Sequence, residues 1–211
     1  MSIITSQLGK IVAGAVMIVA ATGIADAESA IELTNVAFAP VIGATSIPIG
    51  HAQFCKVHPD ECQPHATTTD IFVLTEDLWQ QLVGVNNRMN SEIVPITDQD
   101  LYQVGELWTY PDNGYGDCED IALAKRRALI EAGWDPSALL MAVVREHNGN
   151  GHAVLMVRTD RGDLILDNQD GMVRLWNETN YQFVKRQSQY HASEWVLIDD
   201  TRPVVTVAST N

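Results

Sequence analysis

A change in hydrophobic period at Gly133 is the feature that most constrains the fold of this chain. The run before it begins at Cys118 and consists of good helix formers, and Gly133 offers a helix stop. One broad apolar face is formed by Ile121, Ala122, Ala128, Leu129 and Ala132. Lys125, Arg126 and Arg127 mark the side of this helix that we expect to be solvated.

Strand patterns follow the helix. Apolar residues recur with period two in several runs, at 138–146, 152–158, 164–167, 181–187 and 194–198. The sequences Asn-Gly-Asn-Gly at 148–151 and Asp-Arg-Gly at 160–162 are typical of hairpin turns. Helices first and an antiparallel sheet second predict an α+β fold.

The N-terminal half is less regular. Helical spacing is seen at Leu74, Leu78, Leu82 and Val85. This helix is expected to continue through Asn86, Asn87 and Asn90, whose amides could line a cleft or merely end the helix, and we favour the structural interpretation.

Two further segments are expected on either side of that helix. An edge strand is expected near 31–38, and a short helix or irregular segment over 98–112. Trp108 and Tyr110 near its end could hold a ring over Cys118 or pack in the core.

The first residues resemble a secretory signal. Lys10 is the only charge before an apolar run at 11–21, and Ala25-Asp26-Ala27 supplies small residues for cleavage. We therefore expect an exported protein with a signal peptide at 1–27 and a single domain at 28–211. The apolar run is short for a membrane span, with an uncleaved anchor as the alternative, and no later segment approaches about 18 apolar residues.

The chain is acidic, with a formal net charge of −14. Removal of residues 1–27 takes away one charge of each sign and leaves this value unchanged. Nucleic acid is therefore not an expected partner. Clustered carboxylates could instead bind a hard cation such as calcium.

The chain has three cysteines, of which Cys55 and Cys62 lie seven residues apart. An oxidising compartment favours a disulfide between them, and neighbouring prolines mark a loop that a short cross-link would pin. His51 and His58 complete a spacing that also resembles a zinc site, and two free thiols are the third possibility.

Cys118 is placed as a nucleophile would be. Gly114 and Gly116 interrupt the chain before it and Asp117 can cap a helix, so Cys118 is expected in the first helical turn. Unpaired N–H groups and the positive end of the helix dipole stabilise a thiolate there. The alternative is a small buried cysteine under a helix.

A cysteine nucleophile needs a base and a group that orients the base. Among the histidines, His152 at the start of a strand is the best placed base, and Asp167 at the end of the next strand is the preferred orienting group, with Asn168 as its rival.

Whether this pair meets depends on strand register. A two-residue loop at 161–162 would place Asp167 opposite Met156, roughly 13 Å along the strand from His152 at about 3.3 Å per residue. A Cys118–His152–Asp167 triad therefore requires a bulge or looser turn that moves Asp167 toward Val154 or His152.

Asp117, Glu119 and Asp120 surround the thiol with carboxylates that should oppose its ionisation. Bound Ca²⁺ would offset their charge, because carboxylate oxygens are the ligands it prefers. The alternative is a capping cluster paired with Lys125 or Arg126.

Three blocks give a family resemblance: GDCEDIALAKRRALIEAGW, GHAVLMV and LILDNQDG. In this order and spacing they resemble the bacterial transglutaminase-like cysteine proteinases, the LapG-like group of the transglutaminase/papain superfamily, over residues 45–200. The resemblance implies a papain/transglutaminase-like α+β fold with the nucleophile at a helix N-terminus packed on an antiparallel sheet. It also implies a periplasmic location and a triad of Cys118, His152 and Asp167.

The same resemblance implies calcium and partners. Characterised members cut large surface adhesins, require calcium around the DCED segment and are restrained by an inner-membrane receptor that senses cyclic di-GMP. Carried over, calcium would use Asp117 and Glu119, with Asp120. The paired Cys55 and Cys62 are not a feature of those adhesin-cleaving members, which leaves substrate and receptor open.

The leading interpretation is an exported, calcium-dependent cysteine endopeptidase. A second possibility passes the same acyl-enzyme to an amine, as a transglutaminase does, because water and lysine compete for one intermediate. A third is a non-catalytic binding module that retains a triad-like core.

Overall fold

The strand patterns assemble into one seven-stranded sheet with the order β1-β9-β8-β4-β5-β6-β7. The computed structural model describes residues 37–65 and 72–202, so the expected signal peptide at 1–27 and nearly all of the expected strand at 31–38 lie outside the described residues. The strands of the sheet are β1 (Val41–Thr45), β4 (Leu139–Arg145), β5 (Gly151–Thr159), β6 (Gly162–Leu166), β7 (Arg174–Leu175), β8 (Gln182–Gln187) and β9 (Trp195–Ile198).

Every pair of neighbouring strands in this sheet is antiparallel. The two strands β4 and β5 lie at its centre and are buried almost throughout. Residues of β5 alternate between two apolar clusters: Leu155 and Val157 pack with the helices, and Val154 and Met156 pack on the opposite face. The predicted strands in the second half of the chain are confirmed, and the short strands β1 and β7 are additional.

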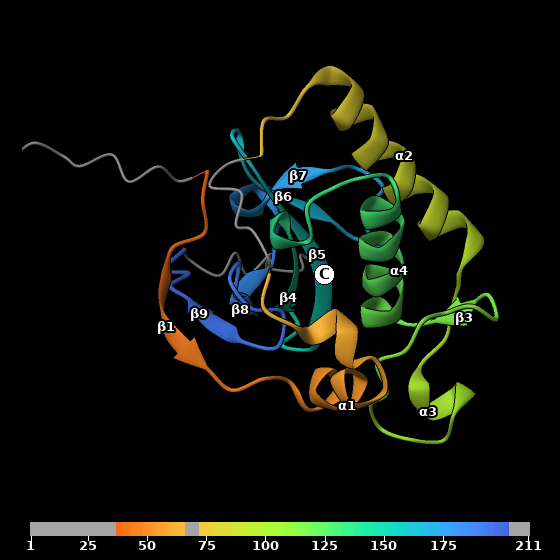
Figure 1. Ribbon diagram of the computed structural model, residues 1–211. Helices are drawn as coiled ribbons and strands as arrows, with labels where there is room; N and C mark the ends of the chain where they lie inside the picture. The colour runs from red at the N-terminus through yellow and green to blue at the C-terminus, as the bar shows by residue number, and fades with distance from the viewer. Residues whose placement is uncertain (1–36, 66–71, 203–211) are drawn as a thin grey trace, which may run out of the picture. The chain divides into compact units, whose positions relative to one another are not determined.

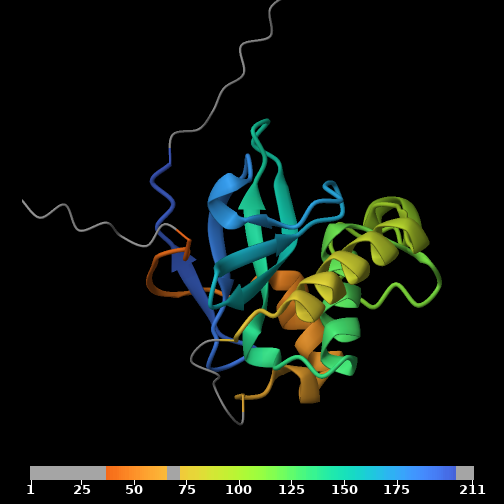
Figure 2. The same ribbon diagram turned by 90° about the horizontal axis from the view of Figure 1, so that it is seen from above.

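The helices gather on one face of the sheet, as Figure 2 shows. They are α1 (Ile49–Val57), α2 (Glu76–Glu92), α3 (Asp98–Leu101) and α4 (Cys118–Glu131), and short 3-10 turns are η1 (Pro59–Cys62), η2 (Pro136–Ala138) and η3 (Trp176–Glu178). A small parallel pair, β2 (Val94–Pro95) and β3 (Tyr115–Gly116), precedes α4. The fold is α+β, as predicted, and α4 runs beside β5 (Figure 1).

Two helices differ from the sequence expectation. The region around Cys55 and Cys62, expected to be a loop, forms α1 and η1. Helix α2 begins at Glu76, after Leu74, because the Thr75 side chain accepts a hydrogen bond from the Leu78 N–H and caps the helix there.

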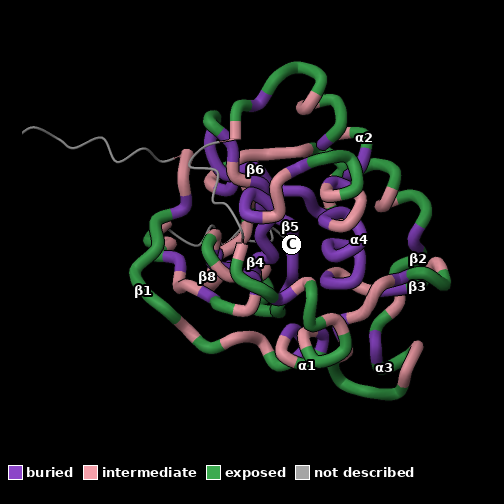
Figure 3. The backbone as a smooth tube through the Cα atoms, in the orientation of Figure 1, coloured by how far each residue is buried: buried purple, intermediate pink, exposed green. Residues whose placement is uncertain are grey.

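The expectation that Lys125 and Arg126 are solvated is wrong. Lys125 is 0 % exposed and Arg126 is 5 % exposed, and α4 is buried along most of its length (Figure 3). Arg126 donates to the Leu139 carbonyl oxygen at 3.1 Å and forms an ion pair with Glu61 at 3.3 Å. The helix contacts α2 and the sheet on different sides, so a single apolar stripe does not describe its buried surface.

Candidate active site

Cys118 is the first residue of α4, as predicted. Asp117 occupies the N-cap position, but its side chain makes no capping hydrogen bond and instead accepts one from the Asp98 N–H at 3.3 Å. The preceding Gly116 packs tightly: a Cβ atom there would lie 2.7 Å from the Cβ of Asp120. Only glycine therefore lets the chain enter α4 so close to its own first turn.

The Cys118 thiol is half-buried in a cleft of about 380 Å³ that is also lined by His152 and Trp108. The thiol donates a hydrogen bond to Glu119 Oε2 at 3.0 Å. Burial raises the pKa of Cys118, and the charge of Glu119 adds to the rise, whereas the backbone N–H of Ala153 acts in the opposite direction. Burial and the charge of Glu119 thus both favour the thiol over the thiolate.

The predicted base and orienting group form a direct pair. His152 lies at the start of β5 and Asp167 directly follows β6, and His152 Nε2 lies 2.8 Å from Asp167 Oδ1. Both residues are buried. Because an ionised carboxylate only accepts, Nε2 carries the proton, which leaves Nδ1 as the basic nitrogen of the ring.

The strand register explains the contact between His152 and Asp167, without the bulge or looser turn that was expected. Thr159 pairs with Gly162 and Leu155 pairs with Leu166, so the turn is a tight one at 160–161, one residue earlier than expected. Gly162 accommodates it with a φ of +121°. Continued by one residue, this register brings Asp167 beside Val154, about 6.6 Å along the strand from His152, a gap that two side chains can span.

Asp167 is fixed by more partners than the sequence indicated. Its Oδ1 accepts the Gln169 N–H at 3.0 Å, and its Oδ2 accepts the Tyr181 hydroxyl at 2.5 Å. Its carbonyl oxygen accepts the Asn90 side-chain amide at 2.8 Å. Burial acts to raise the pKa of Asp167, but the hydrogen bonds from His152, Tyr181 and Gln169 outweigh it and the pKa lies below its usual value.

Tyr181 and Asn90 were not recognised as site residues from the sequence. The ring of Tyr181 also packs on that of His152, with centroids 5.3 Å apart. Asn90 projects from α2, where the sequence left open whether its amide lines a cleft or merely ends the helix, and the structural interpretation was favoured. No spacing rule links either residue to Asp167, because the contacts depend on tertiary packing.

A carboxylate cluster lies beside Cys118. Asp98, Asp117 and Glu119 place side-chain oxygens within 4.8 Å of one another. Burial raises the pKa of Asp98, and burial together with Asp117 raises the pKa of Glu119. Asp117 Oδ1 is buried and has no hydrogen-bond partner among the described residues. Crowded acidic oxygens with an unpaired acceptor fit a hard cation such as Ca²⁺.

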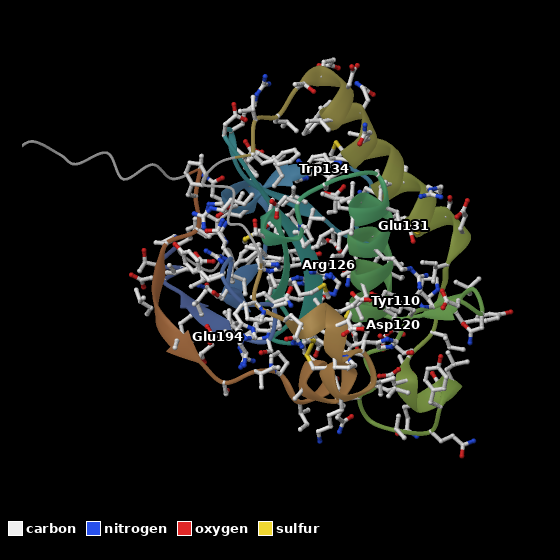
Figure 4. The ribbon with its side chains drawn as sticks, in the orientation of Figure 1. Tyr110, Asp120, Arg126, Glu131, Trp134 and Glu194 are labelled. Carbon is white, nitrogen blue, oxygen red and sulfur yellow. A yellow bond between two sulfur atoms is a disulfide. The ribbon has the colours of Figure 1, made fainter. Side chains whose placement is uncertain are left out.

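Asp98 was missed as a member of this cluster, and Asp120 lies outside the group of three. Asp120 accepts the Thr109 N–H at 2.8 Å, and its Oδ2 has no hydrogen-bond partner within 37–65 and 72–202. Burial raises the pKa of Asp120 to about 7. Figure 4 shows Asp120 near the first turn of α4 and Arg126 further along, on the side toward the sheet.

The alternative that Lys125 or Arg126 neutralises these carboxylates is wrong. Arg126 forms its ion pair with Glu61. Burial lowers the pKa of Lys125, and the charged group that counteracts this shift is Asp167. Among the described residues, no ion pair joins either cation to Asp117 or Glu119.

A disulfide joins Cys55 to Cys62, as expected, so Cys118 is the one free thiol of the three cysteines. This excludes the zinc alternative, in which both sulfurs would be ligands. His51 is buried and accepts the Trp195 indole N–H at 3.1 Å, and His58 packs on Phe54.

The two aromatic candidates have different environments. Trp108 lines the Cys118 cleft and also packs in the core, with its ring centroid 5.3 Å from that of His51. Tyr110 donates its hydroxyl to Glu61, and the Arg127 guanidinium lies 4.0 Å from its ring centroid.

Comparison with known proteins gives one family match. The family described as bacterial transglutaminase-like cysteine proteinase (BTLCP) matches residues 41–203. A search of curated proteins finds no match. Within the described ranges, no helix combines the length and apolar character needed to cross a membrane.

Solved structures of LapG from Legionella pneumophila are also similar to this chain. The calcium-bound form is 22 % identical, with a TM-score of 0.48, and the match covers 60 % of this chain and 71 % of that one. The EGTA-treated form is 23 % identical, with a TM-score of 0.48 and coverage of 59 % and 72 %.

Proposed function

Because the chain belongs to the family of bacterial transglutaminase-like cysteine proteinases, we propose that Cys118, His152 and Asp167 are its catalytic triad and that it hydrolyses peptide bonds in a protein substrate. The observation that supports this most directly is the buried 2.8 Å contact between His152 Nε2 and Asp167 Oδ1, made by a histidine that lines the same cleft as the free thiol of Cys118.

The chemistry follows from these positions. His152 Nδ1 takes the thiol proton, and the thiolate of Cys118 attacks the substrate carbonyl carbon. The orphan backbone N–H groups at the start of α4 stabilise the oxyanion. The protonated ring then gives its proton to the leaving amine as the C–N bond breaks, and water releases the acyl group with His152 again as the base.

We also propose that the enzyme requires calcium and that Asp98, Asp117 and Glu119 hold it, with Asp120 nearby. Calcium bound there would supply positive charge that offsets these carboxylates and favours the thiolate. Glu119 contacts both the thiol and the cluster. Its Oε2 accepts the hydrogen bond of the Cys118 thiol, and its side chain belongs to the carboxylate cluster. Cation binding and the state of the nucleophile are therefore linked through one side chain.

Location and partners complete the proposal. Residues 1–27 direct export to the periplasm, the substrate is a large surface adhesin, and an inner-membrane receptor for cyclic di-GMP restrains the enzyme. These points are supported by the signal-like N-terminus and by the resemblance of the GDCED, GHAVLMV and LILDNQDG blocks to the family. Sequencing of the mature protein should find Glu28 as its first residue, and a mature chain that starts at Met1 would contradict export by cleavage.

Cleavage assays test the catalytic assignment. The purified enzyme is incubated with the exported protein fraction of its source, and new N-termini are identified by mass spectrometry. Cys118→Ala and His152→Ala should abolish their appearance without lowering the melting temperature by more than a few degrees, whereas His147→Ala, at an exposed histidine, should not. Cleavage by Cys118→Ala would refute the triad, and products linked to an amine would show acyl transfer.

A further inference from the structure

Lys125 is a buried amine that the proposed reaction does not use. It is 0 % exposed, and its Nζ has no hydrogen-bond partner in the part of the chain that the structure describes. Burial lowers its pKa to about 7, and Asp167 is the charged group that acts against this shift. An unpaired buried ammonium group is strongly unfavourable, so such a lysine requires a compensating environment.

The position of Lys125 on α4 defines that environment. Ile121 and Ala124 pack in a cluster with the end of α2, and Ala122 and Leu129 pack in the cluster on the helix side of the sheet. At 100° per residue, position 125 falls between these two faces. Lys125 therefore enters the junction of α2, α4 and the sheet.

Two asparagines of α2 face the segment that carries Asp167. Asn86 and Asn90 are four residues apart and share one side of the helix. The Asn90 side-chain amide donates to the Asp167 carbonyl oxygen at 2.8 Å, and the Asn86 amide donates to the carbonyl oxygens of Asp170 and Gly171 at 3.1 and 3.2 Å. Together they clamp residues 167–171 against α2.

The side-chain oxygen atoms of these asparagines take no part in those hydrogen bonds. The Oδ1 atoms of Asn86 and Asn90 are buried and lack partners among the described residues, as does the Oδ1 of Asn168. Asn86 and Asn90 hydrogen-bond to this segment, and the charge of Asp167 within it acts on Lys125. Amide oxygens without donors and an ammonium with donors to spare thus occur around the same segment. Their chemistry is complementary, because a lysine ammonium has three N–H donors and no acceptor.

We propose that Lys125 is a positioning residue for the proposed triad: its ammonium group reaches the amide oxygens of Asn86, Asn90 and Asn168 through bridging water, and so fixes the segment that holds Asp167 against His152. The assignment rests on the proposed triad. Lys125 acts through Asp167 and touches no substrate. His152 Nε2 contacts Asp167 Oδ1, and the charge of Asp167 acts on Lys125, so a change at Lys125 reaches the proposed base.

Lys125→Met tests the assignment, with Lys56→Met at an exposed lysine as the matched control. Methionine is close in volume and apolar, so the melting temperature should stay equal or rise. The kcat for peptide cleavage should fall roughly tenfold or more with KM within about twofold, because the loss is confined to the transition state. Lys56→Met should leave all three values unchanged.

A spectroscopic readout separates positioning from bulk stability. In ¹H NMR spectra, the low-field signal of the His152 Nε2 proton should shift or broaden in Lys125→Met and stay in place in Lys56→Met. If Lys125→Met does not fold, Lys125→Gln retains a donor and should give a smaller change of the same signal. A wild-type signal and wild-type kcat in the folded variant would overturn the proposal.

A double-mutant cycle tests whether Lys125 acts through the asparagines of α2. If Lys125 acts through the clamp, Asn90→Ala combined with Lys125→Met should lower kcat little more than either change alone. If the two substitutions lower kcat independently, so that their fold-changes multiply in the double variant, the proposal is overturned. Failure of the triad itself is recognised separately, because Cys118→Ala would then remain active.

Discussion

The Tyr181 hydroxyl donates a 2.5 Å hydrogen bond to Asp167 Oδ2, the carboxylate oxygen that His152 does not use. A carboxylate that accepts on both oxygens is fixed in rotation and stabilised in its ionised form. The orienting group is therefore itself held in place by a ring that packs on the histidine.

Tyr181→Phe should keep the ring and remove this bond. Loss of a hydrogen bond to a charged group is worth about 1.5–3 kcal/mol, so kcat/KM should fall roughly tenfold or more. The pKa of Asp167 should rise, which moves the acid limb of activity to higher pH. The pH dependence of Cys118 alkylation by iodoacetamide measures this, and Tyr190→Phe, at a residue 70 % exposed, is the control. Equal profiles for the two variants would contradict the assignment.

Asp98→Asn should weaken calcium binding by roughly 10- to 100-fold, since it removes one negative oxygen ligand from the cluster. Isothermal titration with CaCl₂ measures the affinity without recourse to activity. Asp100→Asn changes an exposed carboxylate of the same short helix and should have no effect. An unchanged affinity in Asp98→Asn would exclude Asp98 as a ligand.

Two glycines should respond oppositely to alanine. Gly116→Ala places a Cβ 2.7 Å from that of Asp120 and 3.1 Å from that of Pro111, so it should lower the free energy of unfolding by about 1–3 kcal/mol. Gly84 lies inside α2 with nothing within 4 Å of its added Cβ, and Gly84→Ala should raise that free energy by about 0.5–1 kcal/mol. Urea unfolding monitored by circular dichroism decides both signs.

His51 should make the fold sensitive to mild acid. Burial lowers the pKa of His51 to about 4 from 6.5. Below pH 6.5, His51 binds a proton in the unfolded chain but not in the folded chain. The free energy of unfolding therefore falls as pH decreases from 6.5 to 4, by up to roughly 3 kcal/mol. His51→Gln should flatten the pH dependence of urea unfolding, and the exposed His147→Gln should not. A steeper dependence in His51→Gln would contradict this reasoning.

Local pattern predicted the start of α4 at Cys118 and the main strands, because these follow from helix-forming runs, period-two alternation and turn residues. The turn between β5 and β6 was placed one residue too late, and since each residue of turn position moves the pairing by two, Asp167 was expected opposite Met156. Small local differences thus decide whether His152 and Asp167 meet.

Other features could not be found from local pattern. Asp98 joins Asp117 through a tertiary contact 19 residues apart in sequence. Lys125 and Arg126 were assigned to solvent because an amphipathic helix was assumed to bury one face, whereas α4 contacts α2 as well as the sheet. Their burial follows from how the elements are assembled, which the spacing of apolar residues within one helix does not encode.

The hairpin of β5 and β6 has a consequence for how the proposed triad is assembled. His152 and Asp167 come together through neighbouring strands, and isolated hairpins close in about 1–10 μs. Cys118 joins them only when α4 packs on β5, a contact between more distant segments that is slower to form. A newly made chain therefore carries a thiol without its base until tertiary assembly is complete. An incompletely folded copy should therefore lack peptidase activity.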